Sequence, residues 1–486
     1  MKRFISLTLA LLMVLGAMAL TACKKNTEQK PSGKTNSSSQ TEDPNLSADE
    51  RFDVPKQEIG RVMTALTYNS TIPEFGKEED ESGDSVNYTL VQRDNIVKEH
   101  LGIEMKVTSI EGQFGSMTSF IETVTNTVFG NVEAYDIIGA YCLIPVSLMV
   151  TGIIEDLNTV ENVDFSKTWW SDFIHDAVTL NNKTYFMSGE LSANLLYNMQ
   201  IMLFNTGLLE SYGGDLTKND LYSLVDNNEW TIDRFFEIAS ALSLPSDTVD
   251  EASKIYAIGM SDQNQLDSFY IASGLHLFEI QDGALTVSQD TNSNKVLSLL
   301  DKVSNAAYSS KILNVNGGTT GFKTNKEVFT IAAVKYVKTD FNEMKDIGLL
   351  PFPKYSEDDS YHTLLGNDHA EYFITSNVKN KAESGAFLET LAYAGSIQIT
   401  PDVYYRIMKK QYSKDAASSR MFDIIRAGTT TEFGILSYNL FEGGNAPASM
   451  FRNAVLLKRD WTSYYKQSFE SPMTKVAGQL NAFFED

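Results

Sequence analysis

Residues 61–68 read RVMTALTY, and residues 90–107 read LVQRDNIVKEHLGIEMKV. The first stretch has the apolar and β-branched composition that is typical of a strand. In the second, apolar residues recur at helical spacing, and Gly102 suits the position that ends a helix. Residues 103–107 then alternate in polarity as a further strand does. The two stretches therefore predict a strand–helix–strand unit.

The alternation of strands and helices continues along the chain. Residues 135–138 predict a strand that runs into Tyr141. Farther on we expect a helix that Thr231 caps, another over residues 296–303, and a buried strand within residues 347–353 that proline ends. Strands that alternate with helices predict an α/β fold with a mostly parallel sheet.

The first residues have the features of an export signal. A basic start precedes an almost entirely apolar run over residues 4–20, which is too short for a membrane span of about 20 apolar residues. Residues 20–23, LTAC, resemble the lipobox of bacterial lipoproteins, whose Cys is acylated. We expect a cleaved signal peptide at residues 1–22, lipidation of Cys23, and export to the outer face of the cell membrane; the alternative is a Cys buried in a hydrophobic helix. Residues 23–56 are polar, and we expect a disordered tether.

The charge of the chain limits the classes of molecule that it can bind, and its cysteine content limits its disulfide bonds. The chain has 40 Lys and Arg against 63 Asp and Glu, a net charge of −23. Such a surface repels polyphosphate, so nucleic acid is excluded as a partner. It also repels anionic lipid, so we expect acyl chains on Cys23 to be the sole membrane anchor. Cys142 then has no disulfide partner, and we expect it to be a small buried core residue.

Short motifs in a fixed order carry a family resemblance. They are NKTY at 182–185, LFN at 203–205 followed by YG at 212–213, WTID at 230–233, YAIG at 256–259 and GLLPFP at 348–353. In this order the sequence resembles the family 1 extracellular solute-binding proteins of ABC importers, the group that includes maltose-binding protein. Residues 404–425 resemble a subgroup of lipoproteins from low-GC Gram-positive bacteria.

The resemblance implies a periplasmic-binding-protein-like fold of type II, with two α/β lobes joined by hinge crossovers. By analogy, lobe one comprises residues 57–187 and 329–375, and lobe two comprises residues 188–328 and 376–445. Residues 446–486 form C-terminal helices that pack on lobe two and the hinge. The resemblance also implies a monomer that closes around a ligand between its lobes and delivers it to the permease subunits.

Strand ends and cleft segments supply the candidate ligand-binding residues. In α/β lobes ligands meet the carboxyl ends of strands, and a sugar needs aromatic rings to stack on and polar side chains for its hydroxyl groups. We expect such side chains to carry little core packing. The candidates are Tyr68, Asn69 and Tyr141 at strand ends, Asp368 in a Gly-containing loop, Asn264, Asp267 and Tyr270 in a segment that faces the cleft in the family, Tyr438 in a second such segment, and Trp170 as a sugar platform, with a surface anchor as the alternative.

No catalytic constellation stands out in the sequence. The five His residues lack metal-ligand spacing, and there is no phosphate-binding loop or nucleophile motif, so we expect no enzyme activity, metal or cofactor. The leading hypothesis is a lipid-anchored receptor of an ABC importer that binds a small solute, which we expect to be a carbohydrate. The alternatives are a cell-surface polysaccharide-degrading enzyme and a ligand receptor that signals to a sensor kinase.

Overall fold

The structure is a computed structural model, and it describes residues 54, 57–79, 83–242, 244, 254–412, 416–441 and 445–485. Cys23 and the predicted signal peptide lie outside the described residues, and of the predicted tether only Val54, which is buried, is described. Within the described part of the chain, none of the helices combines the length and the apolar character needed to cross a bilayer.

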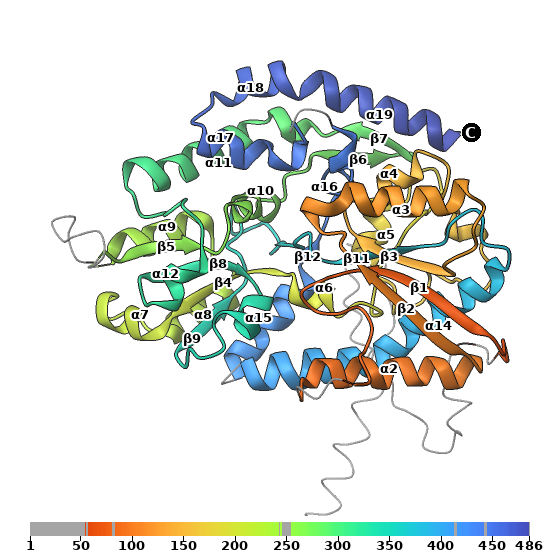
Figure 1. The fold of residues 1–486 in the computed structure, drawn as a ribbon. Coiled ribbons are helices and arrows are strands. Elements are labelled where there is room, and N and C mark those ends of the chain that lie inside the picture. Colours follow the sequence, from red (N-terminus) through yellow and green to blue (C-terminus); the bar gives the residue numbers. More distant parts are fainter. Residues whose placement is uncertain are drawn as a thin grey trace, which may run out of the picture. The chain divides into compact units, whose positions relative to one another are not determined.

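The first sheet contains the predicted strand–helix–strand unit (Figure 1). Its strands are β1 (Val62–Tyr68), β2 (Glu104–Ile110), β3 (Ile137–Tyr141) and β11 (Ala370–Phe373), in the order β11-β3-β1-β2. Strand β1 runs parallel to β2 and β3, with Ala65 opposite Val107 and Ile137, whereas β11 is antiparallel to β3. The strands predicted at residues 61–68, 103–107 and 135–138 are thus confirmed.

The helix of this unit, α2 (Ser85–Leu101), has well-defined ends. The Asp84 side chain accepts a hydrogen bond from the backbone N–H of Val86 and caps the first turn. At the other end Gly102 has φ 58°, a left-handed conformation that suits glycine, and its N–H donates to the carbonyl of Lys98. The predicted helix end is therefore confirmed. Helix α14 (Lys381–Ile399) packs against α2.

The second sheet contains β4 (Gln200–Asn205), β5 (Tyr256–Met260), β8 (Glu327–Ala333) and β9 (Ile347–Leu350), in the order β5-β8-β4-β9. Strand β8 is parallel to β5 and antiparallel to β4, and β4 is also antiparallel to β9. We expected residues 329–375 in the first lobe, so the placement of β8 and β9 was wrong. Both are short buried strands, and their sequences do not tell which sheet they join. We also expected residues 376–445 in the second lobe, but α14 packs against α2 beside the first sheet, so that placement was wrong for α14. The other lobe boundaries stay predictions.

Helices and one hairpin complete the part around the second sheet. Thr231 accepts a hydrogen bond from the N–H of Arg234 and caps α9 (Ile232–Ala241), as predicted. Strands β6 (Phe278–Gln281) and β7 (Ala284–Val287) form an antiparallel hairpin. The further helices here are α7 (Thr206–Tyr212), α8 (Lys218–Asp226), α10 (Asp267–Ala272), α11 (Asn294–Ser304), α12 (Thr319–Lys323), α13 (Lys335–Thr339) and α15 (Ala416–Ala427).

Two segments carry the chain between the sheets. We call residues 187–199 the outgoing crossover, because they lead from the first sheet into β4. We call residues 365–372 the returning crossover, because they lead back to the first sheet and include most of its strand β11. The two segments lie side by side, joined by antiparallel bridges between Met187 and Tyr372 and between Met199 and Leu365. Just before the returning crossover, β10 (Thr363–Leu364) pairs with β12 (Thr429–Thr430).

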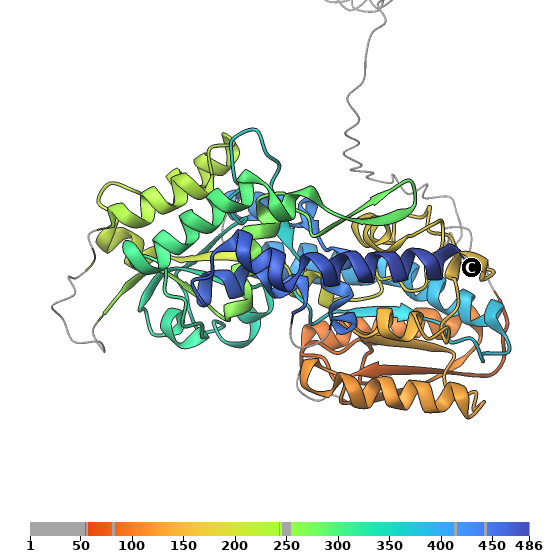
Figure 2. The same ribbon diagram turned by 90° about the horizontal axis from the view of Figure 1, so that it is seen from above.

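The C-terminal helices pack along the hairpin and neighbouring helices (Figure 2). Helix α17 (Met450–Leu456) packs on α10 and α11, and α19 (Glu470–Glu485) packs on β7, where Asn481 exchanges two hydrogen bonds with the backbone of Leu285. The other α-helices of the described residues are α3 (Met117–Phe129), α4 (Pro145–Met149), α5 (Asp172–Val178), α6 (Asn194–Tyr197), α16 (Phe433–Leu436) and α18 (Trp461–Ser468), and a π-helix over Thr400–Tyr412 continues α14.

Candidate functional site

Three of the predicted ligand-binding residues meet at the carboxyl ends of the first sheet. Tyr68 ends β1 and Tyr141 ends β3, and their rings make an edge-to-face contact with centroids 5.6 Å apart. The Tyr68 hydroxyl donates to Oδ1 of Asp368 at 3.3 Å. Adjacent parallel strands end at the same sheet edge, which explains why the strand-end argument found this group.

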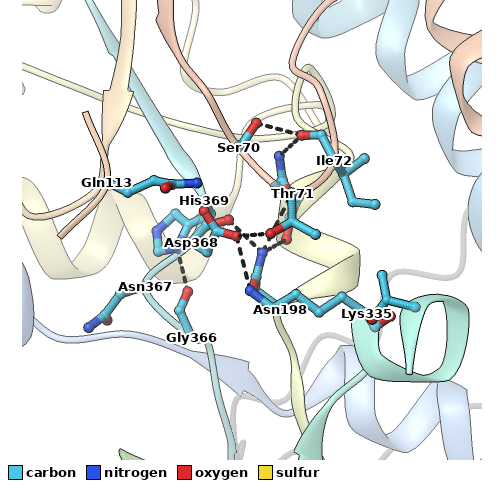
Figure 3. A network of polar contacts seen from close by, with 12 residues as sticks. Ser70, Thr71, Ile72, Gln113, Asn198, Lys335, Gly366, Asn367, Asp368 and His369 are labelled. Carbon is cyan, nitrogen blue, oxygen red and sulfur yellow. Dashed lines mark hydrogen bonds and ion pairs between the residues drawn. The ribbon is translucent and has the colours of Figure 1, made fainter. Parts of the chain in front are cut away.

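The Asp368 carboxylate is the centre of the polar contacts (Figure 3). Its Oδ2 accepts a hydrogen bond from the Thr71 hydroxyl at 2.8 Å. The same oxygen forms an ion pair with Lys335 Nζ at 3.0 Å. Lys335 begins α13, directly after β8 of the second sheet, and Asn198 of the outgoing crossover donates to the backbone carbonyl of Asp368. The Asp368 carboxylate therefore receives groups that follow strands of both sheets, and its backbone carbonyl receives one from a crossover. We call Tyr68, Thr71, Tyr141, Lys335 and Asp368 the Asp368 cluster.

Burial sets the electrostatics of the Asp368 cluster. The side chains of Asp368 and Lys335 retain only 15% and 16% exposure, so the pair is screened little by water. Burial, followed by the nearby Asp368 charge, raises the pKa of Tyr68 well above its usual value, and burial also raises the pKa of Tyr141. Both tyrosines therefore stay neutral hydrogen-bonding groups at physiological pH.

The burial of the two tyrosines corrects one expectation. Tyr68 and Tyr141 are 1% and 6% exposed, so both are core residues, whereas we expected side chains with little core packing. Replacing a large buried aromatic residue with Ala costs about 3–5 kcal/mol of stability. Tyr68→Phe removes only the hydroxyl that faces Asp368 and keeps the buried ring. It therefore tests the role of this hydroxyl in binding without the loss of core packing.

Two aromatic rings lie beside this cluster. Tyr438 contacts Phe114 edge to face with ring centroids 5.4 Å apart, and the Phe114 side chain is 53% exposed. Tyr438 also contributes to the raised pKa of Tyr141, which places it close to that ring. Its neighbour Asn439 donates to the carbonyl of Leu143 at 2.8 Å, just past the end of β3. An exposed ring at this position suits stacking on the apolar face of a sugar.

Asn69 lies at the rim of this region. The Asn69 side chain is exposed and donates a hydrogen bond to Glu111 at 2.8 Å. The backbone carbonyl of Asn69 accepts a hydrogen bond from the Gln113 side chain. Asn69, Glu111 and Gln113 thus place amide and carboxylate groups next to Phe114, although no hydrogen bond joins the Asn69 side chain to Asp368.

Two other predicted residues line a separate pocket. Asp267 and Tyr270 of α10 line a small pocket together with Phe451 of α17 and with Ile271, Leu277, Ile435, Pro447 and Ala448. Asp267 forms an ion pair with Arg452, and burial raises the pKa of Asp267 to about 7 despite this positive partner. The pocket therefore combines a mainly apolar wall with one carboxyl group.

Tyr336 provides an electrostatic link between the cluster and α10. Burial is the largest cause that raises the pKa of the Tyr336 hydroxyl, and the charges of Asp262 and Asp368 raise it further. Asp262 in turn contributes to the raised pKa of Asp267. Asn264, which follows Asp262, is exposed, and its N–H donates to the Asp262 carboxylate at 2.8 Å.

Trp170 is a packing residue in this structure. It is 4% exposed, contacts Phe165 edge to face, and donates its indole N–H to Glu389 at 3.0 Å. Trp169 donates to the other oxygen of the same carboxylate at 2.8 Å. The platform interpretation of Trp170 finds no support in these contacts, because no exposed ring face is left for a ligand.

Cysteine and histidine residues near the cluster have structural partners. Cys142 is buried, as predicted, and donates to the carbonyl of Asn367 at 3.1 Å; burial raises the pKa of its thiol. His369 is buried and lies between the Gly366 carbonyl and Glu371. Among the described residues, no group of three His, Cys, Asp or Glu side chains could hold a metal ion.

Comparison with known proteins identifies the fold. No protein-family model matches the sequence, and no curated protein matches it significantly. Among solved structures, a cyclo/maltodextrin-binding protein complexed with maltotetraose matches with a TM-score of 0.55 and 15% identity, covering 85% of this chain and 97% of that one. The fold is that of a two-domain solute-binding protein.

Other solute-binding proteins share this two-domain fold. The GacH receptor of Streptomyces glaucescens GLA.O, solved without ligand and with acarbose, has a TM-score of 0.53 and 14% identity, with 88% of this chain and 100% of that chain covered. The ABC substrate-binding protein Lmo0181 from Listeria monocytogenes, in complex with cycloalternan, has a TM-score of 0.53 and 11% identity, with 86% and 99% covered. At these identities the likeness establishes the fold.

The sequence did not reveal several members of the site. Lys335 and Tyr336 follow β8, whose sheet was assigned wrongly, so their position near Asp368 could not be expected. Thr71 lies in an irregular loop without a periodic signal. Phe114 could have been found, because it follows the end of β2 as Tyr68 and Tyr141 mark the ends of β1 and β3.

Proposed function

We propose that this protein is the substrate-binding component of an ABC importer and that it captures a carbohydrate at the Asp368 cluster. The observation that carries the proposal is the convergence of Thr71, Tyr68 and Lys335 from both sheets on one carboxylate beside the exposed Phe114 ring. Sugar hydroxyl groups need paired donors and acceptors, and sugar C–H faces need an aromatic ring. The matched solved structures that bind maltotetraose, acarbose and cycloalternan support this ligand class.

The proposed mechanism uses the crossovers. A ligand that contacts Asp368 and Phe114 on one side and α10 or α13 on the other binds best when the two domains are close together. The crossover segments are then the positions at which backbone rotation is absorbed, and the permease would distinguish the ligand-bound arrangement. The protein binds and releases its ligand without chemical change, in line with the substrate-binding proteins that share its fold.

Substitution of the two rings beside the cluster tests the site. Phe114→Ala and Tyr438→Ala should each weaken binding of maltotetraose by about 1–3 kcal/mol, because each removes a stacking surface. Phe114 is exposed and Tyr438 is half-buried, so stability should change little. Phe129→Ala is the matched control, since Phe129 is 71% exposed at the end of α3. A thermal-shift titration gives both affinity and stability, and equal affinity in all three variants would place the site elsewhere.

We also propose that Cys23 is the acylated N-terminus and that the protein is held at the outer face of the cell membrane. The support is the sequence LTAC at residues 20–23 after an apolar run. Mass spectrometry of the protein from its native membrane should show a mature chain that begins at Cys23 and carries acyl chains. An unmodified Cys23 with residues 1–22 still attached would contradict the proposal. Cys23→Ala should release the protein from the membrane fraction.

A further inference from the structure

A loop without helix or strand carries Thr71 to the Asp368 cluster. It follows β1 and comprises residues 69–76. Its backbone has few regular contacts: the N–H of Asn69 donates to the Ile110 carbonyl, and the N–H of Gly76 donates to the Asp94 carboxylate, both at 2.8 Å. The position of Thr71 must therefore be fixed by side-chain contacts of this loop.

Glu74 supplies those contacts from a buried position. Its side chain accepts hydrogen bonds from the Tyr372 hydroxyl at 2.8 Å, from Asn194 Nδ2 at 2.8 Å and from the Ser192 hydroxyl at 3.1 Å. Glu74 is 1% exposed, so these three donors replace the water that a carboxylate otherwise binds. Ser192 and Asn194 belong to the outgoing crossover, and Tyr372 belongs to the returning one.

The backbone of the same loop is attached to the same region. Asn194 also donates to the carbonyl of Ile72, next to Thr71. Arg93, which is fully buried in α2, donates to the carbonyl of Glu74 at 2.7 Å and to the carbonyl of Leu191 at 2.6 Å. The loop is thus attached to the outgoing crossover through both its side chain and its backbone.

We propose that Glu74 is a positioning residue that holds the loop at residues 69–76, and with it Thr71, in a fixed place relative to both crossovers. Glu74 is buried and does not itself contact ligand. When the crossovers rearrange, Ser192, Asn194 and Tyr372 move, and their hydrogen bonds to Glu74 carry the loop with them. The relevance to ligand rests on the proposed function, because that function places the ligand at Asp368.

Hydrogen exchange in the ligand-free protein tests the positioning directly. Glu74→Gln puts an amide group in place of an oxygen that accepts hydrogen bonds, so the Asn69 and Gly76 amides should exchange about tenfold faster than in the wild type. Tyr372→Phe removes one donor of the three and should give a smaller increase at the same amides. Glu327→Gln is the matched control, because Glu327 is equally buried at 3% exposure but lies in β8 of the second sheet.

The outcomes separate positioning from general stability. Faster exchange confined to the loop and the crossovers, with β1, β2, β3 and the second sheet unchanged, is the expected result. An unchanged loop in both Glu74→Gln and Tyr372→Phe would overturn the proposal, and so would a uniform increase over both sheets, which would mean that Glu74 only stabilises the fold.

Affinity for maltotetraose provides the second readout. Glu74→Gln should bind this probe about tenfold more weakly than the wild type, while Glu327→Gln should bind it equally well. Equal affinity of Glu74→Gln and the wild type would contradict a role in ligand binding. If the wild type binds no oligosaccharide, the proposed function fails, and the exchange result alone decides whether Glu74 positions the loop.

Discussion

Replacing Arg93 with Met should destabilise the protein by about 3–5 kcal/mol, one of the largest effects expected for a single substitution. Arg93 is fully buried, and its guanidinium binds Asp94 at 2.5 Å in addition to the carbonyl groups of Glu74 and Leu191. Burial raises the pKa of Asp94, and Arg93 is the main influence that opposes the shift. Without Arg93, the buried Asp94 carboxylate loses its cation and keeps only the N–H of Gly76, and the carbonyl groups of Glu74 and Leu191 each lose a donor.

Urea denaturation measures this loss, and an exposed ion pair provides the control. Arg234 pairs with Glu237 on the surface, with side chains that are 44% and 67% exposed, so Arg234→Met should cost less than about 1 kcal/mol. The Arg93 variant should also show weaker ligand binding, because Arg93 holds the loop that carries Thr71. If both variants lose the same small amount of stability, the buried network does not have the role assigned to it.

The second large effect concerns pH. Glu327 at the start of β8 is 3% exposed, and burial raises its pKa from 4.5 to about 7. Two glycines make the space for it: a Cβ on Gly259 would lie 1.8 Å from the carboxyl carbon, and one on Gly321 would lie 2.2 Å from Oε1. Burial is opposed only by a hydrogen bond with Thr330, and no basic group is among the causes that shift the pKa of Glu327. The neutral acid is therefore the form that the folded protein prefers.

The sign of the pH effect follows from the raised pKa of Glu327. Between about pH 4.5 and 7 the folded protein binds a proton that the unfolded chain has released, so stability falls as the pH rises through this range and levels off above it. At about 1.4 kcal/mol per pH unit the contribution is about 3 kcal/mol. Glu327→Gln, which cannot ionise, should lose this contribution to the pH dependence.

Denaturation of the wild type and Glu327→Gln at pH 5 and pH 8 measures the difference. The loss of stability from pH 5 to pH 8 should be smaller in the variant by about 3 kcal/mol. Asp267 and Glu389, whose pKa values burial also raises to about 7, should leave a residual pH dependence of the same sign in both proteins. An equal pH dependence in the two proteins would show that Glu327 is ionised in the folded state.

The sequence predicted the local features of the fold well. The first strand, the helix that follows it and its end at Gly102 depend on hydrophobic periodicity and on one residue with a left-handed backbone, and both signals lie within a few residues. The sheet to which β8 and β9 belong depends on pairing with β4, more than 100 residues earlier in the sequence. Short buried strands carry no signal for such a distant partner.

The same distinction holds for the candidate site. Tyr68, Tyr141 and Asp368 were predicted because strand ends and a glycine-containing loop are visible in the sequence. Lys335 reaches Asp368 only through the pairing of the second sheet, so no local pattern indicates it. The Trp170 interpretation shows the reverse difficulty: an indole suits both a sugar platform and a buried site with a hydrogen-bond acceptor, and Glu389 supplies that acceptor.

Titration calorimetry with a series of linear and cyclic malto-oligosaccharides tests the central claim most directly. The wild type should bind at least one of them saturably at a single site, Asp368→Asn should bind it at least about tenfold more weakly, and chromatography of the same sample should recover the sugar unchanged. Lys335→Met should weaken binding as well, because it leaves Asp368 without its cation. A folded wild type that binds none of the sugars, binding that Asp368→Asn leaves intact, or a cleaved sugar would contradict the account.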